Sequence, residues 1–229
     1  DGILTSGETV GLSVPLYNFG TSLANGVSAI LSSDSDLVTI LNSTVSYGNI
    51  NVGESNYGDN FTLSVSPIAI QNEDLDLKIT ISDNSGNQWE SLIDVDVLGS
   101  HLVSTSYVNI QPGQTSNINI NLTNQGSLNA SGVTGTLSYS GNLITVNDDT
   151  GTWGNINSGS SVNSSNGFNI TASGDIVNGT TLNMQLQIQD DGGYDRVENV
   201  VLNIGTVSMD DPLGPDQYGY YIYDSGDAE

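Results

Sequence analysis

The chain contains no cysteine, a single histidine at position 101, and only two basic residues, Lys78 and Arg196. The absence of cysteine excludes disulfide bridges, thiolate metal sites and thiol catalysis. A nucleophile and its base would have to be built from serine or aspartate with help from a carboxylate, and no Gly-x-Ser-x-Gly elbow occurs. A carboxylate pair for glycoside hydrolysis is compatible with the composition, but no aromatic cluster marks a cleft for it. We therefore expect no enzymatic activity.

Positive charge is almost missing, because 26 acidic residues face two basic ones and the formal net charge is −24. Such a balance disfavours contact with nucleic acid or with an anionic membrane, and makes cations and cationic proteins the natural counterparts. There is also no apolar run of 18 residues, so we expect no membrane insertion.

The sequence begins with Asp1 and shows no charged-then-apolar leader. We expect it to be a piece of a longer protein. Its loops are rich in Asn, Ser, Thr and Gly with an acidic bias, which is typical of secreted bacterial surface proteins. The expected location is extracellular or on the cell surface, and the expected partners include neighbouring domains of the same longer chain.

An internal repeat is the strongest positive signal. Three motifs recur at a constant offset of 106 residues, and they are Gly7-Glu8-Thr9 with Gly113-Gln114-Thr115, Asn18-Phe19-Gly20 with Asn124-Gln125-Gly126, and Tyr47-Gly48-Asn49-Ile50 with Trp153-Gly154-Asn155-Ile156. A duplication of that period indicates two tandem modules. We assign module 1 to residues 1–99, a short joint to 100–106, module 2 to 107–208 and an acidic, tyrosine-rich tail to 209–229.

Short stretches of alternating apolar and polar residues fill both copies, and Gly and Asn turns separate them. This period-two pattern predicts strands with one buried face. No stretch shows the apolar period of a helix. The expected strands are 10–16, 27–31, 37–41, 61–65, 75–81 and 92–98, followed by 118–122, 133–137, 143–146, 168–170, 182–188 and 200–204. The predicted fold is all-β, with two tandem Ig-like or fibronectin-III-like β-sandwiches.

The repeated motifs resemble the Ig-like CARDB modules of bacteria and archaea and the related NEW3 modules. The likeness covers about residues 1–205 and rests on Gly7-Glu8-Thr9, Asn18-Phe19-Gly20, Asn25-Gly26-Val27, the turn Gly48 to Glu54, and their counterparts in copy two. The resemblance implies an accessory part of a secreted protein, such as a spacer, an adhesion unit or a support for an attached enzyme.

A narrower likeness concerns the tail. The 18 residues from Asp210 to Asp227 are similar to a segment of large gingipain-like (C25-type) cysteine peptidase chains, where it leads from Ig-like modules into a further β-rich domain. The catalytic cysteine and histidine of those peptidases have no counterpart here. The resemblance therefore implies a neighbouring domain, and no activity in this chain.

Clustered carboxylates are the candidate metal ligands, because Ca²⁺ prefers six to eight oxygen ligands. A calcium ion is the only cofactor we expect. The alternative for each cluster is a solvated acidic turn, and the tail tyrosines (Tyr218, Tyr220, Tyr221 and Tyr223) offer a docking strand instead of, or besides, an ion site. The candidate ligands are Asp210, Asp211, Asp216, Asp224 and Asp227 in the tail, Asp190 and Asp191 before a Gly-Gly pair, and, more weakly, Asp148 and Asp149.

Three aromatic positions invite interpretation. Tyr47 and Trp153 occupy equivalent places in the two copies, which favours a shared packing role. Trp89 has no aromatic counterpart and is the candidate ligand platform, with packing at the rim as its alternative. Together these features predict a non-catalytic extracellular spacer or interaction module of a larger bacterial protein, stiffened by calcium. The alternatives are an adhesion module that binds carbohydrate or protein, and a subunit of an extracellular filament.

Overall fold

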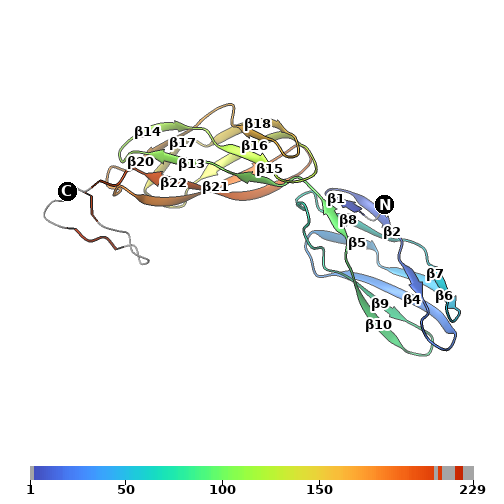
Figure 1. Ribbon diagram of the computed structural model, residues 1–229. Coiled ribbons are helices and arrows are strands. Elements are labelled where there is room, and N and C mark those ends of the chain that lie inside the picture. The colour runs from blue at the N-terminus through green and yellow to red at the C-terminus, as the bar shows by residue number, and fades with distance from the viewer. Residues whose placement is uncertain (1–2, 209–210, 213–219, 224–229) are drawn as a thin grey trace. The chain divides into compact units, whose positions relative to one another are not determined.

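The computed structural model describes residues 3–208, 211–212 and 220–223, and the fold is all-β. The chain divides into two compact units, Asp1–Gly99 (unit 1) and Ser100–Glu229 (unit 2), each built as a β-sandwich (Figure 1). Among the described residues, no helix has the length and apolar character needed to cross a membrane.

Unit 1 consists of a four-stranded sheet in the order β10-β9-β4-β6, a three-stranded sheet β2-β8-β5, and the pairs β3-β7 and β1-β11. All pairs are antiparallel except β1 with β11. The strands are β1 (Ile3–Thr5), β2 (Thr9–Leu12), β3 (Pro15–Tyr17), β4 (Ala24–Ser33), β5 (Val38–Asn42), β6 (Thr44–Ile50), β7 (Ser55–Tyr57), β8 (Phe61–Val65), β9 (Leu77–Ser82), β10 (Gln88–Ile93) and β11 (Asp96–Leu98).

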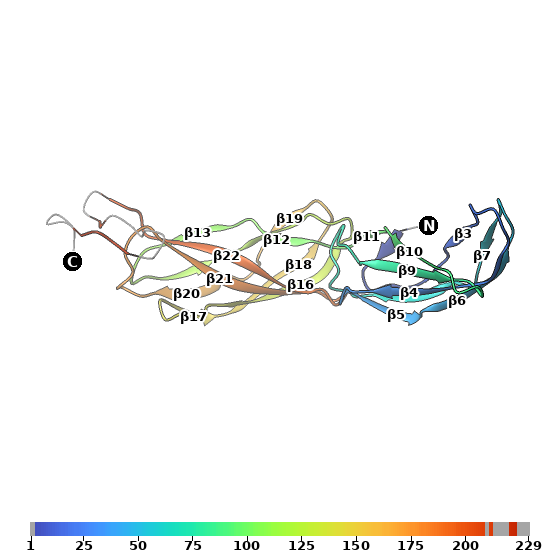
Figure 2. The same cartoon turned by 90° about the horizontal axis from the view of Figure 1, so that it is seen from below.

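Unit 2 repeats this arrangement with a five-stranded sheet β13-β22-β21-β16-β18 and two three-stranded sheets, β14-β20-β17 and β12-β15-β19. Figure 2 shows its longest strands, β21 and β22, side by side. The strands are β12 (Leu102–Ser104), β13 (Tyr107–Ile110), β14 (Thr115–Ile118), β15 (Asn121–Asn124), β16 (Ala130–Ser138), β17 (Ile144–Asp148), β18 (Thr150–Ile156), β19 (Ser161–Asn163), β20 (Phe168–Ala172), β21 (Thr180–Gln189) and β22 (Asp195–Ile204).

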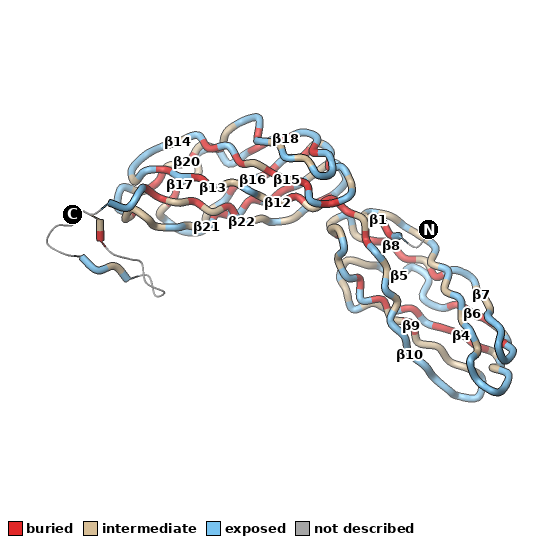
Figure 3. Tube along the Cα trace, viewed as in Figure 1, coloured by how far each residue is buried: buried red, intermediate tan, exposed pale blue. Residues whose placement is uncertain are grey.

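Alternation along the strands creates one core in each unit, and buried and exposed positions follow one another along the trace in Figure 3. In β8, Phe61, Leu63 and Val65 are buried while the residues between them are half-buried. The counterpart β20 has the same pattern. This is the geometry that a period-two sequence dictates, because successive side chains of a strand point to opposite faces.

The repeated Gly-Asn-Ile motif forms the same bulge in both units. Gly48 has φ = 67° and Gly154 has φ = 68°, values that favour glycine. The next residue stabilises the bulge, since Asn49 Oδ1 accepts a hydrogen bond from the Gly26 N–H at 2.9 Å. Its counterpart Asn155 accepts from the Gly132 N–H in the same way. The motif is therefore required by the backbone at this corner of each sandwich.

The bulge also explains the aromatic residue before the motif. Tyr47 and Trp153 fall at register shifts in β6 and β18, and neither has an opposite residue on the neighbouring strand. Both side chains are buried. The Tyr47 hydroxyl donates to the Val14 carbonyl at 2.8 Å, and Trp153 Nε1 donates to the equivalent carbonyl of Ile120 at 2.9 Å. Tyr47 and Trp153 are different residues, but both pack in the core and donate a hydrogen bond to the equivalent backbone carbonyl.

The structure interrupts three of the expected strands. The stretch 10–16 is divided into β2 and β3, the equivalent stretch 118–122 is divided between β14 and β15, and the stretch 92–98 is divided into β10 and β11. The break before β3 does not depend on Pro15, because Asn121 starts β15 at the equivalent position. In both units the chain passes from one sheet to another at this point. In unit 2 the counterpart of β10 and β11 is the single strand β22.

The two units differ most in one strand. Residues 102–104, which the sequence analysis assigned to the joint, form β12 and pair with β15. The counterpart of β15 in unit 1 is β3, which pairs with β7 alone among the described residues. One edge of β3 therefore has no partner strand in this part of the chain.

Candidate functional site

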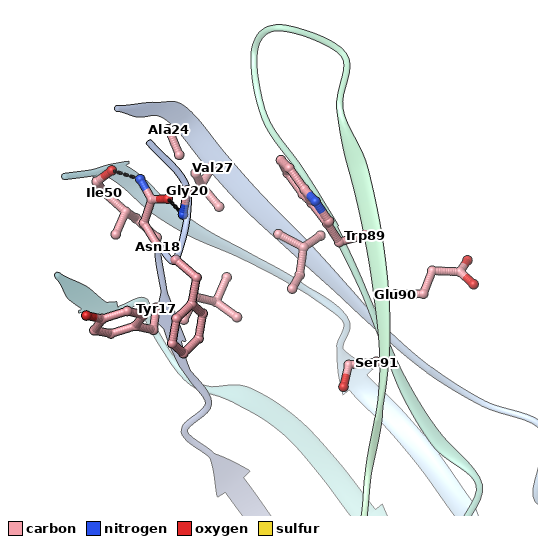
Figure 4. Close-up of a pocket in the computed structure, with 12 residues that line it drawn as sticks. Tyr17, Asn18, Gly20, Ala24, Val27, Ile50, Trp89, Glu90 and Ser91 are labelled. Atoms are coloured by element: carbon pink, nitrogen blue, oxygen red, sulfur yellow. Dashed lines mark hydrogen bonds between the residues drawn. The ribbon is translucent and has the colours of Figure 1, made fainter. Parts of the chain in front are cut away.

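A pocket of about 410 Å³ lies in unit 1 between this edge of β3 and strand β10 (Figure 4). Its size is in the range usual for small-ligand sites. One wall is formed by the end of β3 and the following turn, and the other by β10. The base is apolar. The lining residues are Leu16, Tyr17, Asn18, Phe19, Gly20, Ala24, Val27, Ile50, Ile81, Trp89, Glu90 and Ser91.

Three aromatic side chains surround the opening. Phe19 is 90% exposed, and Tyr17 and Trp89 are each about half exposed. The Tyr17 and Phe19 rings contact each other, with centroids 4.2 Å apart and planes inclined by 50°. Figure 4 shows Trp89 on the opposite wall, turned toward the base of the pocket. Exposed aromatic residues gathered around an apolar hollow are typical of a binding surface.

Alternation along β10 determines which of its side chains face the pocket. Glu90 points away from the hollow in Figure 4 and forms an ion pair with Lys78, with Nζ and Oε2 2.9 Å apart. The residues on either side, Trp89 and Ser91, are turned toward it. The carboxylate of Glu90 is therefore directed away from the hollow, although Glu90 is one of the lining residues.

Asn18 fixes the other wall. Its Nδ2 donates to the carbonyls of Ser22 and Ile50, both at 2.9 Å, and its Oδ1 accepts from the Gly20 N–H at 2.9 Å. The Asn18 backbone bonds toward the β7 side, to the Glu54 carbonyl and the Gly53 N–H. These contacts tie the turn that carries Phe19 to β6 and to the residues before β7.

In unit 2 the corresponding space is filled. The side chain of Leu102 from β12 is completely buried, and its N–H donates to the hydroxyl of Tyr194 at 3.3 Å. Tyr194 is itself buried, and burial raises the pKa of its hydroxyl to about 12. Asn124, the counterpart of Asn18, makes the same turn contacts and is also fully buried.

Burial of the lining residues confirms the difference between the units. Leu122, Ala130 and Ile188 of unit 2 are fully buried, each with 0% exposure. Their counterparts in the pocket of unit 1, Leu16, Ala24 and Ile81, are all partly exposed. Among the described residues, the same sandwich position is therefore covered in unit 2 and uncovered in unit 1.

The predicted metal ligands Asp190 and Asp191 lie in the β21–β22 hairpin turn. Asp190 Oδ1 accepts hydrogen bonds from the N–H groups of Gly192 and Tyr194, at 2.8 and 2.9 Å. The hairpin of unit 1 uses Asp83 in the same way, with bonds from Ser85 and Asn87. These bonds, led by that from the Asn87 side chain, lower the pKa of Asp83. The acidic residue at this position thus has a turn-forming role in both units.

Of the tail carboxylates, Asp211 lies within the described residues, whereas Asp210, Asp216, Asp224 and Asp227 lie outside them. Asp211 accepts hydrogen bonds from the Asn178 side chain at 2.7 Å and from the Ser208 N–H at 2.6 Å, and both lower its pKa. Near it, the Tyr221 and Thr180 hydroxyls are 2.7 Å apart. Within 3–208, 211–212 and 220–223, no three His, Cys, Asp or Glu residues gather in a group that could hold a metal ion.

The structure places the predicted residue Trp89 in the pocket wall, together with two residues that sequence reasoning missed. Tyr17 and Phe19 stand where the second copy has Thr123 and Gln125. An aromatic pair replacing two polar residues within an otherwise repeated motif is a signal that a comparison of the copies could have used.

No family profile matches the chain, and no curated protein matches it significantly. Among solved structures, a protein of unknown function from Porphyromonas gingivalis W83 aligns with 14% identity and a TM-score of 0.29, covering 88% of this chain and 94% of that one. The YadV chaperone aligns with 13% identity and a TM-score of 0.28, covering 87% and 95%. Both TM-scores are below 0.5, so neither similarity bears on the function.

Proposed function

We propose that the chain is a non-catalytic interaction module of a larger secreted or cell-surface bacterial protein. Unit 1 carries the binding site, in the pocket between β3 and β10, and unit 2 is a closed structural spacer. The observation that carries this proposal is the aromatic-lined hollow of unit 1, where Tyr17 and Phe19 stand in place of Thr123 and Gln125 of the second copy.

The physical argument is that exposed apolar surface has a free-energy cost in water that a folded protein normally avoids by filling the space. In unit 2 the equivalent strand carries the polar residues Thr123 and Gln125 at these places. Unit 1 instead keeps Tyr17, Phe19 and Trp89 exposed around the hollow. This arrangement favours a bound partner.

The proposal can be tested with an uncharged environment-sensitive dye, Nile red, titrated into the whole chain. We expect saturable one-to-one binding that changes Trp89 fluorescence and that is abolished by Ala24→Leu, which fills the pocket. Leu92→Ala, at an exposed position of β10 that does not line the pocket, is the matched control and should bind normally. Failure of Nile red to bind, or equal binding to the filled variant, would contradict the proposal.

Carbohydrate is a second candidate ligand, favoured by the exposed faces of Tyr17, Phe19 and Trp89, since sugar rings stack on aromatic side chains. Titration with neutral oligosaccharides, followed by the same Trp89 signal, separates this candidate from a peptide ligand.

A further inference from the structure

We propose that the outer face of β3 and β7, with the two turns beside these strands, is a docking surface for a separate protein that presents basic side chains next to apolar ones. We call this surface the β3–β7 face. It goes beyond the pocket of the proposed function, because it lies on the outside of the sandwich and shares only two residues with the pocket lining. Its apolar members, exposed by 43 to 90%, are Tyr17, Phe19, Leu23, Val52 and Tyr57.

The residues of the β3–β7 face adjoin one another. The register of β3 with β7 makes Tyr17 and Tyr57 diagonal neighbours on one side of the strand pair. The Tyr17 and Phe19 rings are in contact, with centroids 4.2 Å apart. Val52 lies in the turn before β7, and the N–H of the next residue donates to the Asn18 carbonyl at 2.9 Å. The turns after β3 and before β7 are therefore joined.

The second copy has polar residues at all five positions, namely Thr123, Gln125, Asn129, Ser158 and Asn163. Two of these residues are hydrogen-bonded within the face. The Ser158 N–H donates to Asn129 Oδ1 at 2.9 Å, and the Ser158 hydroxyl donates to the Gly126 carbonyl at 2.6 Å. The side chains of Leu23 and Val52 can form neither bond. Because both copies use the same backbone here, these two side chains are neighbours that expose hydrocarbon instead.

The exposure of the β3–β7 face does not depend on what lies beside the edge of β3. In unit 2, β12 covers the edge of β15, yet Gln125, Asn129, Ser158 and Asn163 remain exposed. Strands pair in the plane of a sheet, whereas side chains stand on its two faces. A strand at the edge of β3 would therefore leave this apolar surface in contact with water, and such surfaces mark interaction sites.

The charge of this face also differs between the copies. Residues 15–23 and 51–59 contain two carboxylates, Glu54 and Asp59, and no basic residue. Both acidic residues are exposed. The second copy has serine at both positions. The face is therefore apolar and acidic in unit 1, and polar and neutral in unit 2.

This combination indicates the chemistry of the partner. Basic side chains complement the two carboxylates, and the guanidinium of arginine also stacks on tyrosine and phenylalanine rings. Leu23 and Val52 are complemented by apolar groups. A protein surface offers both kinds of group, and aromatic and arginine residues are enriched at protein interfaces. This chain has only two basic residues of its own, so a separate protein is the source of the basic groups.

Other occupants agree less well with these residues. A neutral sugar would stack on the aromatic rings, but it would leave the aliphatic and acidic residues of the face without a complement. A second copy of this chain brings a net charge of −24, and Lys78, one of its two basic residues, already forms an ion pair with Glu90. The same charge repels nucleic acid and anionic lipid.

The test uses the whole 229-residue chain, isotope-labelled for NMR, at physiological salt. The probe is a short synthetic peptide in which arginine and leucine alternate. A first control peptide carries citrulline in place of arginine, which keeps the shape and removes the charge. A second carries serine in place of leucine. Amide signals report where each peptide binds, and their titration gives the affinity.

Variants of the chain take their new residues from the second copy, so the shared framework accommodates them. One variant removes the aromatic rings and a second removes the carboxylates. Phe19→Gln alone changes the most exposed side chain of the face and leaves folding intact. Leu92→Ala, at an exposed position of β10, is the control. The first two variants are Tyr17→Thr with Phe19→Gln and Tyr57→Asn, and Glu54→Ser with Asp59→Ser.

We expect the parent peptide to shift the amide signals of residues 17–23 and 51–57, and to leave their counterparts in unit 2 unchanged. Both control peptides should bind about tenfold more weakly or worse. Loss of the rings should weaken binding by a similar factor. Loss of the carboxylates should weaken it less and reduce its salt dependence. Leu92→Ala should bind as the unaltered chain does.

The pocket proposal is tested separately. Ala24→Leu, which fills the pocket, should bind the peptide normally while it fails to bind Nile red. Peptide binding without Nile red binding would overturn the pocket and support the β3–β7 face. Nile red binding without any peptide binding would overturn the β3–β7 face and leave the pocket proposal in place.

Three further results would overturn the inference. Equal binding of the citrulline peptide would show that the partner need not be basic. Signal shifts spread over acidic turns of both units, such as those at Asp83 and Asp190, would show attraction by net charge alone. Self-association that rises with protein concentration and is abolished by Phe19→Gln would make a second copy the occupant.

Discussion

Units 1 and 2 share the devices that build the sandwich and differ in how one edge is closed. The bulge glycine, the asparagine that stabilises it, the buried aromatic residue and the turn asparagine do the same work in both. At the edge next to β3 and β15, unit 2 adds β12 and unit 1 leaves a hollow. The comparison separates residues that both sandwiches use in the same way from residues that differ between the copies.

The largest expected difference concerns two equivalent leucines beside this edge, Leu122 of unit 2 and Leu16 of unit 1. Leu122→Ala should lower the free energy of unfolding of unit 2 by about 2–5 kcal/mol, because the side chain is fully buried and its removal leaves a cavity. Leu16→Ala should cost unit 1 only about 1 kcal/mol, since that side chain is partly exposed.

Urea unfolding followed by residue-resolved NMR signals of each unit measures both losses in one sample. In each variant, the unit that carries no substitution is the internal control and should unfold at its usual urea concentration. Equal losses in the two units would mean that the hollow beside Leu16 is closed in solution.

Replacing the equivalent alanines, Ala130 and Ala24, with leucine should have a smaller effect on the free energy of unfolding. Again only unit 2 should be destabilised. Ala130→Leu should destabilise unit 2 by about 1–3 kcal/mol, because a fully buried alanine leaves no room for three more carbon atoms. Ala24→Leu places the same atoms in the pocket and should leave the stability of unit 1 unchanged within about 0.5 kcal/mol. The same urea series measures both, and a clear destabilisation by Ala24→Leu would contradict an open pocket.

The stability of unit 2 should depend on alkaline pH because the Tyr194 hydroxyl is buried beside Leu102. Its folded-state pKa is about 12, above the value of about 10 for an exposed tyrosine. The contribution of the neutral Tyr194 side chain to the stability of the folded state is therefore fully present below pH 10. It is lost as the pH rises from 10 to 12. Unit 2 should lose stability over this window, and Tyr194→Phe should reduce that loss.

The control for this titration is Tyr139→Phe, a substitution elsewhere in unit 2. It should leave the alkaline loss of stability intact. An alkaline profile that Tyr194→Phe does not alter would show that Tyr194 is not the group responsible.

The smallest expected effect is that of calcium. The carboxylates of Asp210, Asp216, Asp224 and Asp227 predict an ion site attached to unit 2, so millimolar Ca²⁺ should raise the melting temperature of unit 2 by a few degrees relative to EDTA and leave unit 1 unchanged. Changing Asp216, Asp224 and Asp227 to Asn should remove the increase. Equal melting temperatures in Ca²⁺ and EDTA would leave these groups as solvated surface.

Much of the framework could be predicted because it follows from local patterns. Alternation predicted β8 and β20, and the constant spacing of Gly-Asn-Ile indicated that both copies use one backbone. The shared packing role expected for Tyr47 and Trp153 agrees with their burial and their equivalent hydrogen bonds.

The pocket was less accessible to sequence reasoning because it depends on a strand that, among the described residues, covers this edge in unit 2 and not in unit 1. The sequence analysis predicted a joint at residues 100–106. No pattern within these residues indicates that Leu102 pairs with Asn124 or donates a hydrogen bond to the hydroxyl of Tyr194. Trp89 was identified because it lacked an aromatic counterpart. Its neighbours across the pocket come from a turn some 70 residues earlier, a distance in sequence that periodicity does not resolve.

Hydrogen exchange of two equivalent amides in the free chain tests the central claim most directly. The Gln125 N–H is bonded to the His101 carbonyl, whereas its counterpart at Phe19 faces an edge without a strand among the described residues. Our account predicts slow exchange at Gln125 and exchange close to the unprotected rate at Phe19. Equal protection at both amides would show that unit 1 is closed like unit 2 and would contradict the account.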